Sequence, residues 1–544
     1  MQEIEKYDVC VVGAGAAGII FVLEFAKLNP EKKIILVEYG KKNGNVTNDL
    51  DDSILIKNTI NHHVPYECTN KGFGGSTASW GGRCVMYDEV DFVERSILNG
   101  GCTWDVSLFD EILNYIDKSS YYFESGNPNF NLHEIEQFKG KRIADNFVEG
   151  DVTDSVLERW SMPTRFRKRY EKELRLIQNL TILEGFETRE LLKEDKSKLI
   201  TGISTFNAET NQVMIIYAEK YVLSAGAQET TRILLRNKSI FENEPSALGK
   251  FYQGHLSGKI ATIKFWGNAK NTEFGFLKQG EVFIRRRFQF SKKYLIEHNL
   301  LNTTMWLDNP LYFDPNHKSG AMSLMYLAMI TPILGKKLAP PAIAYSITKG
   351  EITKIRSHLV NVIKDFPNSI SIPFKTFYQR YFLERKLPGV FLYSPENTYA
   401  LHFHAEQIPD QSNKMEIGED GKTLIIDYNL LEADIESVIK LHEKLDHSLR
   451  ETNCGELIYW FPKGELNQAI RQMSKDGIHQ SGTTRIAKTV EEGVVDYNLK
   501  VFGLNNLYVC SSSVFPTSGQ ANPTFLLGAF ASRLAKHLSN NEKD

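Results

Sequence analysis

The chain has few cysteines and little net charge. Each of these features excludes some classes of protein. Its 544 residues include only six cysteines, and no two of them form a Cys-x-x-Cys pair. This spacing excludes a disulfide scaffold and most zinc sites, so we expect reduced thiols, a cytoplasmic protein and no bound metal. The 64 basic and 67 acidic residues leave a net charge of −3, so no overall field favours nucleic acid as a partner.

Long apolar runs are also missing. Acidic residues precede the first apolar run, whereas a signal peptide needs a basic start. The most apolar stretch, Ala321–Gly335, is 15 residues long and interrupted by Pro332, so it is too short to span a bilayer, and we expect a buried or lid helix there. The 42% of hydrophobic residues is nevertheless enough for a folded core, in roughly two to four domains or one large α/β unit with a second sheet.

A strand, a glycine-rich turn, a helix and a second strand open the chain. Residues 7–12 (YDVCVV) are typical of a buried parallel strand, and the following helix reaches about Leu28. Residues 34–38 (IILVE) form the second strand. The turn has the sequence GAGAAG, and Glu38 follows its last glycine by twenty residues. This context predicts a dinucleotide site, without deciding between FAD and NAD.

Each part of that site has a physical task. Gly13 allows the tight turn, Gly15 lets the backbone approach a pyrophosphate, and Gly18 lets helix and strand pack closely. Free N–H groups at the start of the helix face the negative phosphates. The Glu38 carboxylate is expected to accept hydrogen bonds from ribose hydroxyls.

Two later segments repeat the pattern of a buried strand followed by a turn and a helix. They are Tyr221–Ser224 and Leu507–Cys510. Widely separated segments therefore belong to one doubly wound α/β sheet, which implies a Rossmann-like cofactor domain interrupted in sequence. We assign to it residues 1–95, 200–255 and 465–544.

The remaining segments, 96–199 and 256–464, are predicted to form a substrate domain with a largely antiparallel sheet and helices. Within it, residues 256–306 and 398–430 alternate apolar and polar side chains with aromatic and β-branched residues. A helical insertion is expected at about 319–390.

The C-terminal segment contains a second constellation. Asn522-Pro523-Thr524 predicts the start of a helix that reaches Leu538, because Asn is a strong N-cap and Pro fits the first helical position. The positive end of that helix suits a developing anion, such as the edge of a reduced flavin. Taken alone, the motif is better explained by a plain capping Asn, and a lone His479 is better explained as a structural residue.

Taken together, the motifs resemble the glucose–methanol–choline (GMC) flavin oxidoreductases. The resemblance rests on the opening βαβ unit and on motifs found in the expected order further along the chain. These are GFGGSTASWGG (72–82), LSAGAQETTRILL (223–235), GKFYQGH (249–255), HQSGTT (479–484), GVVD (493–496) and SVFPTSGQANPT (513–524). The wording is most similar to that of the pyranose oxidase and sugar-acid dehydrogenase branch.

The resemblance implies an FAD-dependent enzyme that oxidises an alcohol, with His479 as the active-site histidine and Asn522 as its partner. It also implies FAD contacts by Gly13, Gly15, Ala16, Ala17, Gly18, Glu38, Gly74, Gly75, Ser76, Thr77, Ser79, Trp80, Gly81, Ser512, Ser513, Asn522, Pro523 and Thr524.

Two positions depart from the family pattern. Pyranose oxidases have a histidine bonded covalently to the flavin just before the tryptophan, and this chain has Ser79 there. We therefore predict non-covalent FAD. Classical alcohol and choline oxidases carry an Asp where this chain has Ser511, which leaves the ribityl contact open.

The expected reaction transfers a hydride from a C–OH carbon to flavin N5 while neutral His479 takes the hydroxyl proton. The substrate is expected to be a sugar, polyol or glycoside-like alcohol, and the acceptor oxygen, a quinone or a carrier. Alternatives are a non-redox flavin lyase of the same fold and a flavin-bound accessory protein at a membrane surface. An NAD-only dehydrogenase leaves the 72–82 and 479–524 segments unexplained.

The insertion is unusually basic. Ser319–Pro388 contains ten Lys or Arg and three Asp or Glu, against a net charge of −3 for the whole chain. Basic and apolar residues alternate in Thr376–Pro388, as in segments that lie on an anionic membrane, although a solvated helix face explains this too. A peripheral membrane contact through 319–388 is one expectation for this segment.

Overall fold

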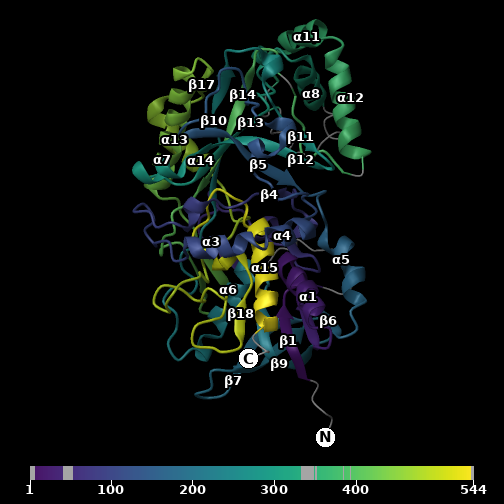
Figure 1. Ribbon diagram of the computed structural model, residues 1–544, viewed down its shortest axis with the longest axis vertical. Helices are drawn as coiled ribbons and strands as arrows, with labels where there is room; N and C mark the ends of the chain where they lie inside the picture. Colours follow the sequence, from purple (N-terminus) through teal and green to yellow (C-terminus); the bar gives the residue numbers. More distant parts are fainter. Residues whose placement is uncertain are drawn as a thin grey trace.

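The structure is a computed structural model that describes residues 6–40, 53–331, 348, 352–383, 385–392 and 394–540. Two parts are stacked along the long axis of the molecule (Figure 1). The first and last described elements, β1 and α15, both lie in the lower part.

The lower part is built on a seven-stranded sheet. Its order is β6-β2-β1-β9-β8-β7, and β18 pairs with the C-terminal half of β9. The strands β6, β2, β1, β9 and β18 run parallel, whereas β8 and β7 continue the sheet antiparallel. The strands are β1 (Lys6–Val12), β2 (Ile34–Glu38), β6 (Leu180–Glu184), β7 (Glu187–Lys193), β8 (Ile200–Asn207), β9 (Gln212–Leu223) and β18 (Leu507–Val509).

The predicted strands at residues 7–12, 34–38, 221–224 and 507–510 therefore join in one sheet, as expected. Residues Val9–Val12 are at most 5% exposed, because the strand is covered on both faces. Helix α1 packs against α15, and α15 packs against α4. The helices of this part are α1 (Ala16–Leu28), α2 (Pro65–Cys68), α3 (Val106–Leu113), α4 (Ile116–Phe123), α5 (Phe166–Arg175), α6 (Gly226–Arg236) and α15 (Pro523–Asn540).

The boundaries predicted for the two domains need correction. Strands β6 and β7 fall in the predicted substrate segment 96–199, but they pair with β2 and β8 in the first sheet. Conversely, β4 falls in the predicted cofactor segment 1–95 and pairs with β5 in the second sheet. The sheet to which each of these strands belongs is decided by backbone pairing with distant segments. A strand as short as β6 or β4 has no local sequence pattern that reveals its partner.

The upper part is built on an eight-stranded antiparallel sheet, as predicted. Its order is β17-β10-β14-β13-β12-β5-β4, and β11 pairs with β12. Helix α13 packs against β17 and β14, and α14 packs against β10. The elements are β4 (Arg83–Cys84), β5 (Val152–Trp160), β10 (His255–Phe265), β11 (Leu277–Gln279), β12 (Val282–Phe290), β13 (Thr303–Asp308), β14 (Thr398–Glu406), β17 (Gly455–Tyr459), α7 (Lys292–Glu297), α13 (Glu432–Glu451) and α14 (Leu466–Met473).

Residues 398–430 divide between two sheets, which corrects the prediction of one. Strand β14 belongs to the large sheet, whereas β15 (Lys414–Ile417) and β16 (Leu424–Asp427) form a small sheet with β3 (Ile54–Ile56). Strand β3 runs parallel to β16, so the small sheet connects an N-terminal segment to a C-terminal one.

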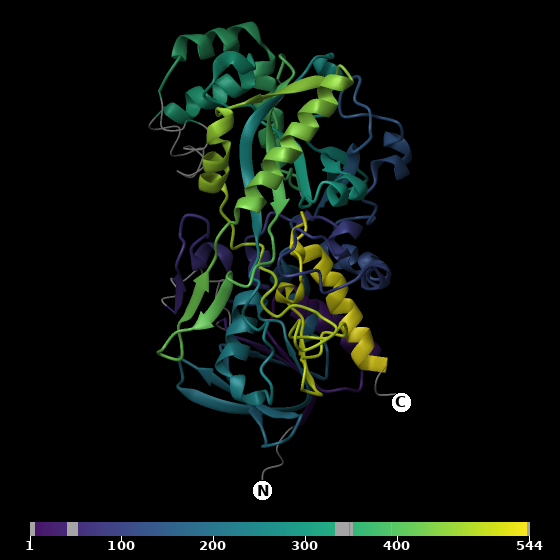
Figure 2. The same cartoon turned by 90° about the vertical axis from the view of Figure 1, so that its left-hand side faces the viewer.

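The basic insertion is helical in the residues that the structure describes. It contains α8 (Gly320–Ile330), α11 (Ile355–Lys364) and α12 (Asn368–Tyr381), at the far end of the upper part (Figure 2). The helix expected over Ala321–Gly335 corresponds to α8, and residues 332–335 lie outside the described residues. None of the described helices is both long and apolar enough to cross a membrane.

Candidate active site

The turn between β1 and α1 leaves no room for side chains at two of its glycines. Gly13 has a φ of +104°, and a Cβ there would lie 2.6 Å from the Cα of Ala225. A Cβ on Gly18 would lie 2.1 Å from the carbonyl oxygen of Gly13. These positions have the tight turn and the close helix packing that the sequence predicts.

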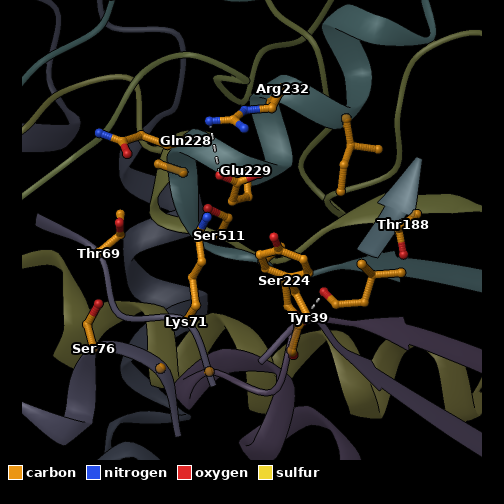
Figure 3. A pocket seen from close by; sticks show the side chains of 18 of the residues that line it. Tyr39, Thr69, Lys71, Ser76, Thr188, Ser224, Gln228, Glu229, Arg232 and Ser511 are labelled. Carbon is orange, nitrogen blue, oxygen red and sulfur yellow. Dashed lines mark hydrogen bonds and ion pairs between the residues drawn. The ribbon is translucent and has the colours of Figure 1, made fainter. Parts of the chain in front are cut away.

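A cavity of about 730 Å³ borders this turn and the C-terminal segment (Figure 3). The β1–α1 turn, the end of β2, the 3₁₀ turn at Gly75–Ala78, the start of α6 and the start of α15 all contribute to its walls. Segments from both ends of the chain therefore surround one space, as expected for an interrupted cofactor domain.

The cavity fits a dinucleotide such as FAD. Gly15 and Gly226 stand at the starts of α1 and α6, and both line the cavity. A Cβ on Gly15 would approach no atom closer than 3.9 Å, and one on Gly226 would meet nothing within 4 Å. Free backbone N–H groups at two helix N-termini thus border open space, which is the arrangement that binds a pyrophosphate.

Glu38 is held by the backbone around the turn. Its carboxylate accepts hydrogen bonds from the N–H groups of Ala14 and Gly40, both at 2.8 Å, and of Gly72 at 3.1 Å. Burial raises the pKa of the carboxyl, and the three N–H donors oppose that rise. Glu38 therefore fixes two glycine-containing loops against each other while it lines the cavity, and its predicted ribose contact remains a prediction.

Most of the predicted cofactor contacts line this cavity. Among them are the glycine turn, the wall from Gly75 to Trp80 and the start of α15. The residues concerned are Gly13, Gly15, Ala16, Ala17, Glu38, Gly75, Ser76, Thr77, Trp80, Ser512, Pro523 and Thr524.

Six predicted contacts, Gly18, Gly74, Ser79, Gly81, Ser513 and Asn522, do not border the cavity. The N–H of Gly74 donates to the carbonyl of Ala14 at 2.7 Å, so this glycine connects the two loops. The hydroxyl of Ser79 accepts from Asn70 Nδ2 at 2.6 Å, and the hydroxyl of Ser513 lies 2.6 Å from that of Thr484. The side chains of Ser79 and Ser513 therefore form hydrogen bonds within the protein.

The wall formed by α6 is not among the contacts predicted from the sequence. Gln228, Glu229 and Arg232 line the cavity, and Glu229 and Arg232 form an ion pair at 3.3 Å (Figure 3). The motif LSAGAQETTRILL predicts a strand, a turn and a helix, and this pattern is the signal for a second helix N-terminus at the cofactor. Tyr39 and Thr188 also line the cavity, and no sequence motif marks them.

His479 and Asn522 meet at the start of α15. The Nδ2 of Asn522 lies 2.5 Å from Nε2 of His479. Because an amide nitrogen donates, Nε2 accepts in this arrangement and the ring proton is on Nδ1. The Oδ1 of Asn522 is buried and has no hydrogen-bond partner among the described residues. The two predicted catalytic residues thus present one acceptor nitrogen and one amide at the same point.

Asp476 holds His479 from the other side. Its Oδ2 lies 3.3 Å from Nδ1 of His479 and 3.3 Å from Nδ1 of His255. Burial alone would raise the pKa of this carboxyl, but His479 and the hydrogen bond from His255 hold it well below its ordinary value. The carboxylate therefore stays ionised beside the two rings.

Two further histidines face His479. His404 of β14 stacks on His255 with ring centroids 4.2 Å apart, and its centroid is 5.5 Å from that of His479. Burial lowers the pKa of both His255 and His404, so both rings are neutral near pH 7. One ring nitrogen from each of the three lies within 4.8 Å of the others, a set of donors that a transition metal accepts, and the absence of a metal remains a prediction.

A cationic and aromatic patch adjoins this histidine group on the large sheet. Arg83 and Arg285 both donate to the buried carboxylate of Glu158, at 2.9 and 2.8 Å. Both guanidinium groups lie over the Trp306 ring, 4.4 and 4.7 Å from its centroid. Trp306 in turn stacks on His402, which is two residues from His404 on the same strand. Only the alternation of His402 and His404 was visible in the sequence.

Comparison with known proteins agrees with these features. Residues 420–531 match the family model described as GMC oxidoreductase. No curated protein matches the sequence. The matched segment contains both His479 and Asn522.

Solved structures share the fold over the whole chain. Pyridoxine 4-oxidase from Mesorbium loti is 14% identical, with 98% of this chain and 99% of that chain covered and a TM-score of 0.51. A fungal aryl-alcohol oxidase is 13% identical, with both chains covered completely and a TM-score of 0.52. Formate oxidase from Aspergillus oryzae RIB40, in a structure concerned with FAD modification, is 15% identical over both full chains, with a TM-score of 0.51.

Proposed function

We propose, from the premise that this chain is a GMC-type FAD-dependent oxidoreductase, that it oxidises an alcohol group to a carbonyl with His479 as the base. The observation that carries the proposal is the contact of 2.5 Å between Asn522 Nδ2 and His479 Nε2. Asn522 directly precedes Pro523 and Thr524, which line the cofactor cavity.

His479 and Asn522 act on the same oxygen. A substrate hydroxyl that takes the place of this direct contact donates its proton to Nε2 of His479 and accepts a hydrogen bond from Nδ2 of Asn522. Asn522 thereby stabilises the alkoxide character that develops as the proton leaves. Bound FAD supplies the two-electron hydride acceptor.

Asp476 maintains the tautomer that this role needs. With its carboxylate facing Nδ1, the ring keeps its proton there and presents an unprotonated Nε2. When Nε2 takes the substrate proton, the ring becomes a cation 3.3 Å from an ionised carboxylate. The neutral rings of His255 and His404 add no competing positive charge.

We propose that the FAD is held without a covalent bond. The serine at position 79, where related pyranose oxidases have the attached histidine, offers a hydroxyl that accepts from Asn70. The cavity provides helix N-termini and backbone donors, which are reversible contacts. Denaturation in acid or heat should therefore release all of the flavin into the supernatant.

A sugar, polyol or glycoside-like alcohol is our proposed substrate. Polar side chains on the sheet beside His479 support this choice: the ring of His404 lies 5.5 Å from that of His479, and Ser257 pairs with His404 in the register of β10 and β14. The hydroxyl of Ser257 lies 2.9 Å from Nε2 of His402, so the sheet presents several groups that hydrogen-bond a polyhydroxylated molecule.

The test is an anaerobic visible spectrum of the purified holoprotein with a panel of sugars, cyclitols and simple alcohols. Bleaching of the oxidised flavin band by one member supports the proposal and identifies the substrate class. Recovery of the band in air then marks an oxidase, and recovery only with a quinone or a carrier marks a dehydrogenase. A flavin that no alcohol bleaches, together with cleavage of a hydroxynitrile, would replace the proposal with a lyase.

A further inference from the structure

A large group of apolar side chains is exposed at the end of the upper part. Among the described residues, 28 large apolar or aromatic side chains are exposed, and twelve of them lie between Ile352 and Leu383. They belong to α11, α12 and the turns beside these helices, at the end remote from β1 (Figure 1). We call these twelve side chains the apolar surface. Scattered single exposures are normal, but such a concentration marks an interaction site.

Helix α12 turns an apolar stripe outward. Ile370, Phe374 and Phe377 are 57%, 72% and 50% exposed, and their spacing of four and three residues places them on one face. The other face is the buried one: Ser369 is fully buried, and its hydroxyl donates to the carbonyl of Val362 at 2.8 Å. This stripe points away from the core, although Ile372 of the same helix packs against the buried cluster that includes Met322.

Helix α11 continues the same surface. Ile355, Leu359 and Ile363 follow the spacing of one helix face, and Ile363 is 74% exposed. The inward face carries polar groups, because Nδ1 of His358 lies 3.0 Å from the hydroxyl of Ser323 on α8. Helix α11 therefore makes a polar contact to α8, helix α12 makes one to α11, and both leave an apolar stripe on the outside.

Basic residues are interspersed with the apolar surface. The sequence from Ile352 to Pro388 has seven Lys or Arg and two Asp or Glu, in a chain with a net charge of −3. Arg356, Lys364 and Lys375 are exposed. One of the two acids, Asp365, faces inward, because it accepts from the backbone N–H of Gly320 at 2.8 Å. The exposed charged side chains beside the apolar surface, Arg356, Lys364 and Lys375, are therefore positive.

We propose that the apolar surface docks on an anionic lipid bilayer, with α11 and α12 lying in the interfacial plane. The Phe and Ile side chains enter the boundary of the acyl chains while Lys and Arg meet the headgroups. A second copy of this chain is a less suitable partner for the apolar surface. In a two-fold contact, the Lys and Arg residues of one copy would face those of the other and repel them. The proposal rests on this surface alone and is independent of the catalytic assignment.

The experiment is co-sedimentation of the full-length holoprotein with vesicles. We expect binding to vesicles of phosphatidylcholine mixed with phosphatidylglycerol, weaker binding to phosphatidylcholine alone, and loss of the difference at high salt. The double variant Phe374→Glu/Phe377→Glu should bind at least tenfold more weakly. Trp266→Glu, which changes an aromatic side chain of 45% exposure elsewhere, is the matched control and should bind as the wild type does.

A second variant keeps the test informative if the double variant unfolds. Lys364→Glu/Lys375→Glu leaves the apolar side chains in place and should reduce binding to the anionic vesicles most strongly at low salt. Failure of the wild type to bind either vesicle would overturn the proposal, as would equal binding by the Phe variant. A wild-type dimer that Phe374→Glu/Phe377→Glu converts to a monomer would also overturn it, in favour of a second copy of the chain.

Discussion

The Oδ2 atom of Asp476 lies 3.3 Å from Nδ1 of His479. Its Oδ1 accepts from the backbone N–H groups of residues 477, 478 and 479, at 2.8, 2.8 and 3.1 Å. The same carboxylate thus shapes the loop that carries the histidine and orients the histidine ring. This arrangement links the local backbone directly to the proposed proton transfer.

Asp476→Asn should slow substrate-driven flavin reduction by about 10²-fold, because the protonated His479 loses its ionised partner. The FAD content should be unchanged, since Asp476 does not line the cofactor cavity. Stopped-flow absorbance under nitrogen measures the rate, and Asp195→Asn, at an exposed carboxylate away from the cavity, is the control. Reduction of the variant at the wild-type rate would contradict this role.

Substitutions at Gly15 and Gly18 should have different effects, the first on FAD binding and the second on the stability of the fold. Gly15→Ala has space in the protein alone but places a methyl group where the pyrophosphate approaches, so FAD affinity should fall at least tenfold with little change in apoprotein stability. Gly18→Ala forces a Cβ against the Gly13 carbonyl and should destabilise the protein by about 1–3 kcal/mol. Flavin titration and urea unfolding of both variants distinguish these effects. Equal apoprotein stabilities would refute the packing role of Gly18.

Stability should fall as the pH drops from about 6.5 toward 4. Burial lowers the pKa of His442 to about 4, and its Nε2 has no hydrogen-bond partner among the described residues. Between these pH values the unfolded chain binds a proton that the native state does not bind. Each such histidine therefore lowers the free energy of unfolding by about 1.4 kcal/mol for each pH unit of acidification. Urea midpoints at several pH values measure the slope, which His442→Leu should reduce. An unchanged slope in that variant would show that His442 is not responsible.

The carboxylate of Glu158 pairs with two arginines, one at each oxygen. Glu158→Gln should lower the free energy of unfolding by about 3–5 kcal/mol, because Arg83 and Arg285 would remain charged, buried and without their carboxylate. Glu416→Gln, at an exposed ion pair with Lys414, should cost less than 1 kcal/mol. Chemical denaturation of the two variants compares them. Similar losses of unfolding free energy in the two variants would contradict the prediction that the buried Glu158 contributes more to stability than an exposed ion pair.

Local patterns were sufficient for part of this architecture. The sequence around Gly13 contains a strand, a turn and a helix in direct succession, so its geometry follows from neighbouring residues. The start of α15 at Pro523 is equally local. His479 and Asn522 were paired through the resemblance to a family, since 43 residues separate them and no periodicity connects them.

The rest depends on contacts between distant segments. Asp476, His255 and His404 come from a loop and two strands, and only the sheet order brings them to His479. The backbone contacts of Glu38 likewise require the loop at Gly72 to fold over the first turn. Sequence spacing contains no information on such contacts, which explains why the sequence predicts the pair His479 and Asn522 but not the residues that surround it.

The most direct test of the central claim compares anaerobic flavin reduction by an alcohol substrate in the wild type and in His479→Ala. The account predicts that the variant retains its full complement of FAD and is reduced 10²–10⁴-fold more slowly, an order of magnitude set by the loss of a general base. Reduction of His479→Ala at the wild-type rate, or a wild-type protein that takes up no FAD, would contradict the account.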